Sequence, residues 1–164
     1  MSATSVVNRG SSDWDAINDG KPSADIRGEA ANAVPDVDDW QSLVSPYRPN
    51  VMTINYKHQF KWPLDDYESV HFTIELKWEF GARYREGGAF IPKVWVDVPE
   101  CFVVWPWTAN LRLWVGNLSN FGQPAAPLAS IAVIFKGAVT SFDTSDNVQW
   151  TYLLYGNGDS ANLN

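Results

Sequence analysis

The segment from Val70 to Phe80, VHFTIELKWEF, alternates strictly between apolar and polar side chains. Successive side chains of an extended strand point to opposite faces, so one face is apolar and the other carries His71, Thr73, Glu75, Lys77 and Glu79. This period of two excludes a helix here and predicts a long strand with one solvent-exposed face. A chain with such a strand must pair it into a sheet and cover its apolar side with a second layer.

The chain after Val51 has the same strand-forming character. Further strands are predicted at Met52–Phe60, Phe90–Val98, Cys101–Trp105, Leu111–Gly116, Ser130–Lys136, Ala138–Phe142 and Val148–Tyr155. Their separators are rich in Gly, Pro, Asn and Asp, and no segment of helical period interrupts them. Roughly seven or eight short strands joined by turns predict an all-β fold, an antiparallel β-sandwich of jelly-roll type.

The N-terminal part differs from the rest in composition. It is rich in Ser, Asp, Asn, Gly and Ala, and its apolar anchors, such as Trp14 and Trp40, are isolated. Apolar side chains this sparse cannot by themselves offset the entropy of ordering the chain. We therefore predict an extended or partly disordered acidic arm at 1–50, a sandwich domain at 51–156 and a flexible tail at 157–164.

One stretch of the arm favours helical turns. PDVDDWQSLV (Pro35–Val44) offers Asp36 or Asp38 as an N-terminal cap for one or two turns. The following segment SPYRPN is predicted to end them, because Pro46 and Pro49 disfavour helical geometry in the residues before them.

Charge and cysteine content exclude several classes of function. The net charge is −7 and no run of Lys or Arg could neutralise several phosphates, so we expect no binding to a nucleic acid backbone. The single Cys101 excludes an intrachain disulfide and, inside an apolar run, is expected to be an inert buried thiol. The N-terminus lacks the pattern of a signal peptide and no apolar run approaches a membrane span, so we expect a cytoplasmic protein or one released without a signal peptide.

Candidate catalytic and metal-binding groups are few. Only two histidines exist, His58 and His71, and a metal site would need a third ligand from another strand. Glu75 and Glu79 face the same way but lie about 13 Å apart by strand rise, too far for a glycosidase pair unless a partner such as Asp97 or Glu100 comes from elsewhere. Nucleophile and phosphate-binding motifs are absent from the sequence. We predict no catalytic residue, no cofactor and no metal.

The nine tryptophans are the most unusual feature of the composition. In CFVVWPW (Cys101–Trp107) apolar side chains occupy both faces, which predicts an inner strand covered on both sides and ended by Pro106. Core positions are the favoured interpretation for Trp78, Trp95 and Trp150.

Trp107 and Trp114 are the rings that this interpretation leaves open. Strand parity places Trp114 on the same face as Arg112, a partly wet outer face. Three roles compete for these rings: core packing, a stacking platform for sugar rings, and anchors of a subunit interface. Trp107, Trp114 and Arg112 are therefore the candidate ligand or interface residues, and Trp14 and Trp40 are the candidate anchors of the arm.

Three segments carry a resemblance to a known family. DDWQSLVSPYRPN (Asp38–Asn50) looks like the S-L-x-x-L-x-x-R-x-R-P segment of coat proteins from small non-enveloped picorna-like RNA viruses, while VWVDVP (Val94–Pro99) and LRLWVGNL (Leu111–Leu118) look like their later strands. The resemblance implies a jelly-roll capsid protein, in the virion or the host cytoplasm, whose arm crosses between neighbouring subunits. The domain is short for a full coat and the nearest matching positions, Val44, Ser45 and Arg48, are imperfectly spaced, which leaves open a projecting or accessory domain of a particle.

These observations lead to a ranked expectation of function. The first is a non-enzymatic structural or assembly protein, a viral capsid or particle component that associates with itself or with other particle subunits, with Trp14 and Trp40 inserted into neighbouring copies. The alternative is a lectin-like, carbohydrate-binding β-sandwich that uses exposed tryptophans. The third is a β-sandwich glycoside hydrolase.

Overall fold

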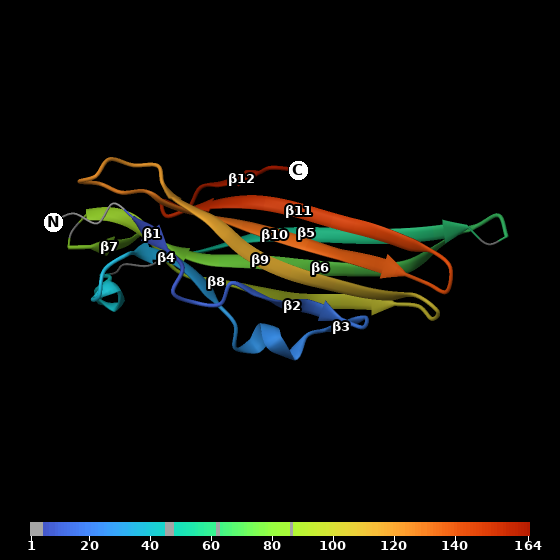
Figure 1. The fold of residues 1–164 in the computed structure, drawn as a ribbon. Coiled ribbons are helices and arrows are strands. Elements are labelled where there is room, and N and C mark those ends of the chain that lie inside the picture. Colours follow the sequence, from blue (N-terminus) through green and yellow to red (C-terminus); the bar gives the residue numbers. More distant parts are fainter. Residues whose placement is uncertain (1–4, 45–47, 62, 86) are drawn as a thin grey trace.

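The protein is described by a computed structural model that covers residues 5–44, 48–61, 63–85 and 87–164. Two antiparallel sheets of six strands each pack face to face (Figure 1), which confirms the predicted all-β sandwich. Three of the strands are 14, 15 and 17 residues long, so the sandwich is elongated along the strand direction. In the described part of the chain, no helix is both long enough and apolar enough to cross a membrane.

The first sheet has the order β1-β4-β8-β6-β5, with β7 paired to β8. Its strands are β1 (Val6–Val7), β4 (Ala31–Pro35), β5 (Arg48–Lys61), β6 (Asp66–Phe80), β7 (Ala82–Tyr84) and β8 (Gly87–Val103). The strands β5, β6 and β8 pair in sequence, and β4, which precedes them, lies beside β8. This arrangement is a Greek key.

The second sheet has the order β12-β11-β10-β9-β2-β3. Its strands are β2 (Asp13–Asn18), β3 (Lys21–Pro22), β9 (Thr108–Asn120), β10 (Ala129–Thr140), β11 (Ser145–Tyr155) and β12 (Ser160–Asn162). Here β9, β10 and β11 form a meander and β2 pairs with β9. A jelly roll combines two Greek keys, so this order does not confirm the jelly-roll topology that the sequence led us to expect.

The strand β6 shows the alternation from which the fold was predicted. Its apolar positions from Val70 to Trp78 are buried between the sheets, whereas His71, Thr73, Glu75 and Lys77 are only half-buried on the outer face. Aromatic contacts join the two sheets, because Phe72 lies against Tyr56 of β5 and both rings meet Trp150 of β11. Trp78 is buried as predicted, whereas Trp95 and Trp150 are only half-buried.

Two predicted strand boundaries are wrong. The segment VPE between Phe90–Val98 and Cys101–Trp105 is not a turn but an irregularity inside β8, where the register against β6 shifts. The lone Gly137 does not interrupt the next pair either, because it lies within β10 opposite Leu111 and Val148. Local composition indicates a turn at both segments, because Pro and Gly are typical of turns. At Gly137 the pairing on both sides of β10 holds the backbone in extended geometry instead.

The N-terminal segment contributes to both sheets. β1 and β4 extend the first sheet, and β2 and β3 extend the second. Trp14 of β2 pairs with Leu113 and is only 2% exposed, and the residues of β4 are buried throughout. The segment predicted as an extended or partly disordered arm therefore contributes extended strands to both sheets, and its buried residues, such as Trp14 and those of β4, line the core of their own chain.

Among the described residues of this segment, helical structure is limited to two short 3-10 turns. The first, Ala24–Arg27, begins at Ser23, whose hydroxyl accepts a hydrogen bond from the Asp25 N–H at 3.2 Å. The second, Trp40–Ser42, follows Asp39, so the caps predicted at Asp36 and Asp38 are wrong by at least one residue. Ser45–Tyr47, in the segment predicted to end this helix, lie outside the described residues.

The C-terminal residues 157–164, predicted as a flexible tail, include β12. This strand pairs with β11, with Asn162 opposite Tyr152. The Asn164 side chain also accepts a hydrogen bond from the Thr151 N–H at 2.6 Å. Polar composition alone did not reveal this pairing because the hydrogen bonds are made by the backbone.

Candidate functional site

Three hairpin connections gather at one end of the sandwich. These are the β5–β6, β8–β9 and β10–β11 connections, at the right of Figure 1. Each carries a large apolar side chain in solvent, because Leu64 is 88% exposed, Trp105 81% and Phe142 80%. Exposed apolar side chains are ordinary when scattered, but the presence of the three most exposed ones at one end makes this end a candidate interaction surface.

Aromatic rings extend this surface across the loops. Trp105 and Phe142 meet edge to face with ring centroids 5.5 Å apart, although they belong to different connections. Trp107 lies 4.7 Å from the ring of His58 and 6.2 Å from that of Phe60, which in turn contacts Tyr67. We call these residues the loop-end patch: Phe60, Leu64, Tyr67, Val104, Trp105, Trp107 and Phe142.

The loop-end patch overturns the interpretation of CFVVWPW as an inner strand. The strand β8 ends at Val103, and the Trp107 N–H donates to the Val104 carbonyl at 2.9 Å to form a turn. Phe102 and Val104 are 44% and 37% exposed. The reason is geometric: the sandwich ends here, so no second layer covers the outer side of these residues. The strand ends three residues before Pro106, so the predicted end at Trp105 is wrong, and Pro106 lies in the turn that follows.

The charges around the loop-end patch are of both signs. Asp65, Asp66 and Asp143 flank the tips, and Lys61, opposite Asp66 at the end of β5, is the nearest cation on the same hairpin. Asp19 and Lys21, in and after the β2–β3 turn, add one charge of each sign. An apolar centre with a mixed rim is the usual composition of a protein interface.

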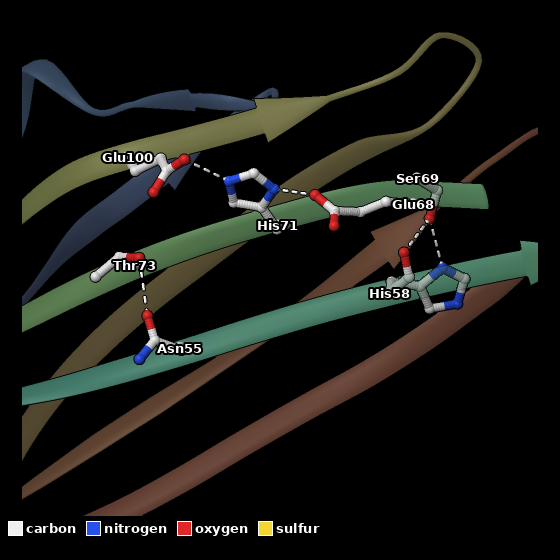
Figure 2. A network of polar contacts seen from close by, with 7 residues as sticks. All are labelled: Asn55, His58, Glu68, Ser69, His71, Thr73 and Glu100. Carbon is white, nitrogen blue, oxygen red and sulfur yellow. Dashed lines mark hydrogen bonds and ion pairs between the residues drawn. The ribbon is translucent and has the colours of Figure 1, made fainter. Parts of the chain in front are cut away.

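A polar network covers the outer face of the first sheet near this end (Figure 2). His71 of β6 lies between two carboxylates: its Nδ1 contacts Glu68 and its Nε2 lies 2.6 Å from Glu100 of β8. The hydrogen bonds to Glu100 and then to Glu68 raise the pKa of His71 above its ordinary value. Phe102 stacks on the imidazole at 5.3 Å, so the charged ring also has an apolar neighbour.

Other polar groups on this face also pair with one another. The Thr73 hydroxyl donates to the Asn55 side chain at 2.9 Å (Figure 2). On the inner side of the same two strands, the buried Ser69 hydroxyl donates to the His58 carbonyl at 2.9 Å. Lys77 binds Asp97 at 2.7 Å. This face therefore satisfies much of its hydrogen-bonding capacity internally, which stabilises β6 against its neighbours rather than leaving open groups for a ligand.

Because the two carboxylates raise the pKa of His71, the stability of the protein should depend on pH. The imidazolium contributes stability fully below the unfolded-state pKa, about 6.5, and that contribution is lost as the pH rises through the higher folded-state value. We expect wild type to lose stability relative to His71→Gln as the pH rises from below about 6.5 through the raised folded-state pKa of His71. Urea denaturation of both proteins across this range measures it. Thr73→Val, which removes a neutral neighbour on the same strand, should show no such pH-dependent difference.

The carboxylates considered for catalysis are distributed among structural contacts. Glu75 lies directly opposite Asp97 on β8, but Asp97 is held by Lys77, and Glu100 is held by His71. Glu79 is placed further along β6, opposite Lys93. Glu75 and Asp97 do line a surface groove beside the first 3-10 turn. Among the described residues no group of His, Cys, Asp and Glu side chains is suited to hold a metal ion.

Arg112 and Trp114 come together on the outer face of the second sheet. The guanidinium binds Asp13 at 2.6 Å and Asp15 at 2.8 Å, and lies 5.7 Å from the centre of the Trp114 ring. Strand parity had placed both side chains on one outer face, and the structure has them there, with Trp114 37% exposed. Trp107 belongs instead to the loop-end patch, so the two candidate rings do not form one surface.

The remaining predicted positions have structural roles in their own chain. Trp14 is in the core and is not available to a neighbouring copy, while Trp40 is half-buried in the second 3-10 turn. Cys101 is half-buried, its thiol donates to the Gly20 carbonyl at 3.4 Å, and burial raises its pKa. A raised pKa keeps the thiol protonated and unreactive.

Sequence reasoning missed three of the most exposed apolar residues, Leu64, Trp105 and Phe142. A signal was present, because each stands next to a turn-forming residue: Leu64 before Asp65, Trp105 before Pro106 and Phe142 before Asp143. A large apolar side chain beside turn residues at the end of a strand occupies a position that a two-layer sandwich cannot cover.

Comparison of the chain with protein-family models, with curated proteins and with solved structures finds no significant match. The function must therefore be argued from the surfaces just described.

Proposed function

We propose that this chain is a non-enzymatic assembly protein, a particle component that associates with a second copy of itself through the loop-end patch. The observation that carries the proposal is the exposure of Leu64, Trp105 and Phe142 on three adjacent hairpin tips. Burying one such side chain is worth about 1.5–3 kcal/mol, and Trp is among the residues that dominate interface energies. Contact with a partner that covers these side chains is therefore expected to be favourable in free energy.

The rim charges favour a copy of the same chain as the partner. In a two-fold interface the same patch meets itself, so Lys61 of one copy can face Asp65 or Asp143 of the other. The net charge of −7 opposes the encounter at long range, which salt screens. Association is therefore expected to strengthen as the salt concentration rises, the reverse of an interface held by surface ion pairs.

The same net charge argues against an anionic membrane as the partner. Asp65, Asp66 and Asp143 stand beside the apolar tips and would be repelled by acidic lipid headgroups. The resemblance of Asp38–Asn50 to picorna-like coat proteins is compatible with a particle component, which in this proposal belongs to a virion or the host cytoplasm. In this proposal the N-terminal segment supports its own chain, and the loop-end patch makes the contact.

Replacing Trp105 and Phe142 together by serine is expected to weaken self-association by about 100-fold or more, because two aromatic anchors of at least about 1.4 kcal/mol each are removed. Sedimentation equilibrium of the full chain over a range of concentrations at low and high salt measures the effect. Phe121→Ser is the matched control, since Phe121 is 60% exposed at the opposite end of β9.

Two results of the sedimentation experiment would contradict the proposal. One is a wild-type chain that stays monomeric up to about 1 mM at high salt, where even an interface of about −4 kcal/mol would be visible. The other is association that Phe121→Ser weakens as much as the double variant does. Binding of the monomer to neutral lipid vesicles that is lost in the double variant would assign the loop-end patch to a membrane instead.

A further inference from the structure

The outer face of the second sheet carries a groove that the assembly proposal does not use. Its volume is about 600 Å³, and it crosses β9, β10 and β11. Two rows of outward side chains border it, one of Arg112, Lys136 and Gln149 and the other of Asn110, Ala138 and Asn147. We call these six residues the β9–β11 groove.

Small residues create the hollow. Ala138 stands between Asn110 and Asn147 in register, so the centre of the second row is a methyl group between two longer side chains. Between the rows lies Gly137, at which a Cβ atom would come within 2.0 Å of the Asn110 carbonyl oxygen. The backbones of β9 and β10 therefore approach closely at this point, and the floor of the groove is held rigid by the sheet.

Three of the polar side chains of the groove are open to a ligand, whereas Arg112 is held by Asp13 and Asp15 and the Asn110 side-chain oxygen accepts a hydrogen bond from the Asp19 N–H at 2.9 Å. In the part of the chain that the structure describes, the side chains of Lys136, Asn147 and Gln149 form no hydrogen bond or ion pair with another residue. The outer face of the first sheet differs, because its polar groups pair with one another (Figure 2). Asn and Gln amides present donors and acceptors together, as sugar hydroxyls do.

An aromatic ring stands beside the groove. Trp114 follows Arg112 by two positions on β9, about 7 Å along the strand and on the same face. Arg112 cannot reorient freely, because Asp13 and Asp15 hold its guanidinium from β2. A ring next to a rigid polar groove provides both an apolar surface for the C–H face of a sugar and fixed partners for its hydroxyls.

From this arrangement we infer that the β9–β11 groove, with Trp114, binds a neutral pyranose glycan. Neutral sugars fit the charge balance: Asp13 and Asp15 neutralise Arg112, and the chain carries a net charge of −7, which disfavours sulfated or carboxylated glycans. The ring stacks on Trp114, and the hydroxyls of the adjoining unit bond to Asn110, Asn147, Gln149 and Lys136. This site lies on the outer face of the second sheet, next to the rim of the loop-end patch at Asn110, whose side-chain oxygen accepts a hydrogen bond from the Asp19 N–H. The inference does not depend on the role of that patch.

A glycan microarray that includes neutral, sialylated and sulfated glycans, probed with the labelled full chain, identifies the ligand, and calorimetry with a bound neutral glycan measures the affinity. Lys136→Ala and Gln149→Ala are each expected to weaken binding about tenfold, as loss of a hydrogen bond worth about 1.4 kcal/mol would. Ala138→Phe, which fills the hollow from an outward position, should reduce binding below detection. Lys57→Ala is the matched control, because it removes an exposed lysine from the outer face of the other sheet.

The inference is overturned if no glycan binds, or if Ala138→Phe binds as well as wild type while remaining folded by circular dichroism. It is also overturned if only sulfated or sialylated glycans bind and physiological salt abolishes the interaction. Loss of binding in Lys57→Ala with retention in Lys136→Ala would place the site on the first sheet and equally contradict it.

Discussion

Trp14→Ala is expected to lower the free energy of unfolding by about 3–5 kcal/mol, a large part of the total for a domain of this size. The indole is 2% exposed and lies in the core with Leu113 as its cross-strand partner. Its removal leaves a cavity between the sheets and weakens the pairing of β2 with β9. Urea denaturation followed by tryptophan fluorescence and circular dichroism measures the loss.

Trp105→Ala makes the same chemical change at a position that is 81% exposed, and should change stability by no more than about 0.5 kcal/mol. Equal effects of the two substitutions would mean that β2 does not pack in the core as described. Trp14→Phe, which retains most of the ring volume, should recover more than half of the stability that Trp14→Ala loses. Deletion of residues 1–44 extends the same argument and is expected to abolish cooperative unfolding, since it removes four strands.

The N-terminal segment also shows which features of the fold cannot be predicted from the sequence. Its composition correctly indicated that it could not fold alone, since its apolar residues are sparse. What composition could not reveal is that the β9 strand, about a hundred residues later, supplies the partner, with Asp13 opposite Trp114. A local pattern predicts which side chains are buried, but not which distant strand covers them.

The strand β6 was predictable for the opposite reason. Its alternation is a local property, and the burial of Phe72, Ile74 and Leu76 follows from it once any second layer is present. The irregularity in β8 near Pro99 was not predictable, because a proline and a neighbouring acid indicate a turn and a bulge equally well.

The candidate sites also differ in how far the sequence predicts them. Parity placed Arg112 and Trp114 together correctly, because both lie on one regular strand. The loop-end patch depends on where the sandwich stops and on which hairpin tips become neighbours, as the contact of Trp105 with Phe142 illustrates. That contact joins the β8–β9 and β10–β11 connections. The sequence of either connection alone does not predict that the other lies beside it.

Gly137→Ala is the second substitution with a large expected effect. A Cβ atom at this position would lie 2.0 Å from the carbonyl oxygen of Asn110 and 2.9 Å from Cα of Leu111, both backbone atoms of the adjoining strand. No side-chain rotation can relieve such an overlap, so β9 and β10 must separate and lose backbone hydrogen bonds. We expect a destabilisation of about 3 kcal/mol or more, the upper end for overpacking a folded structure.

Gly116→Ala provides the control on the neighbouring strand. A Cβ atom at Gly116 would meet nothing within 4 Å, so alanine there should be neutral or raise stability by up to about 1 kcal/mol through a less flexible unfolded chain. Thermal and urea denaturation of both variants compares them directly. A small effect at Gly137 would show that β9 and β10 do not approach closely there, and would remove the rigid floor from which the glycan site was argued; a large effect at both glycines would instead reflect a general intolerance of the sheet to substitution.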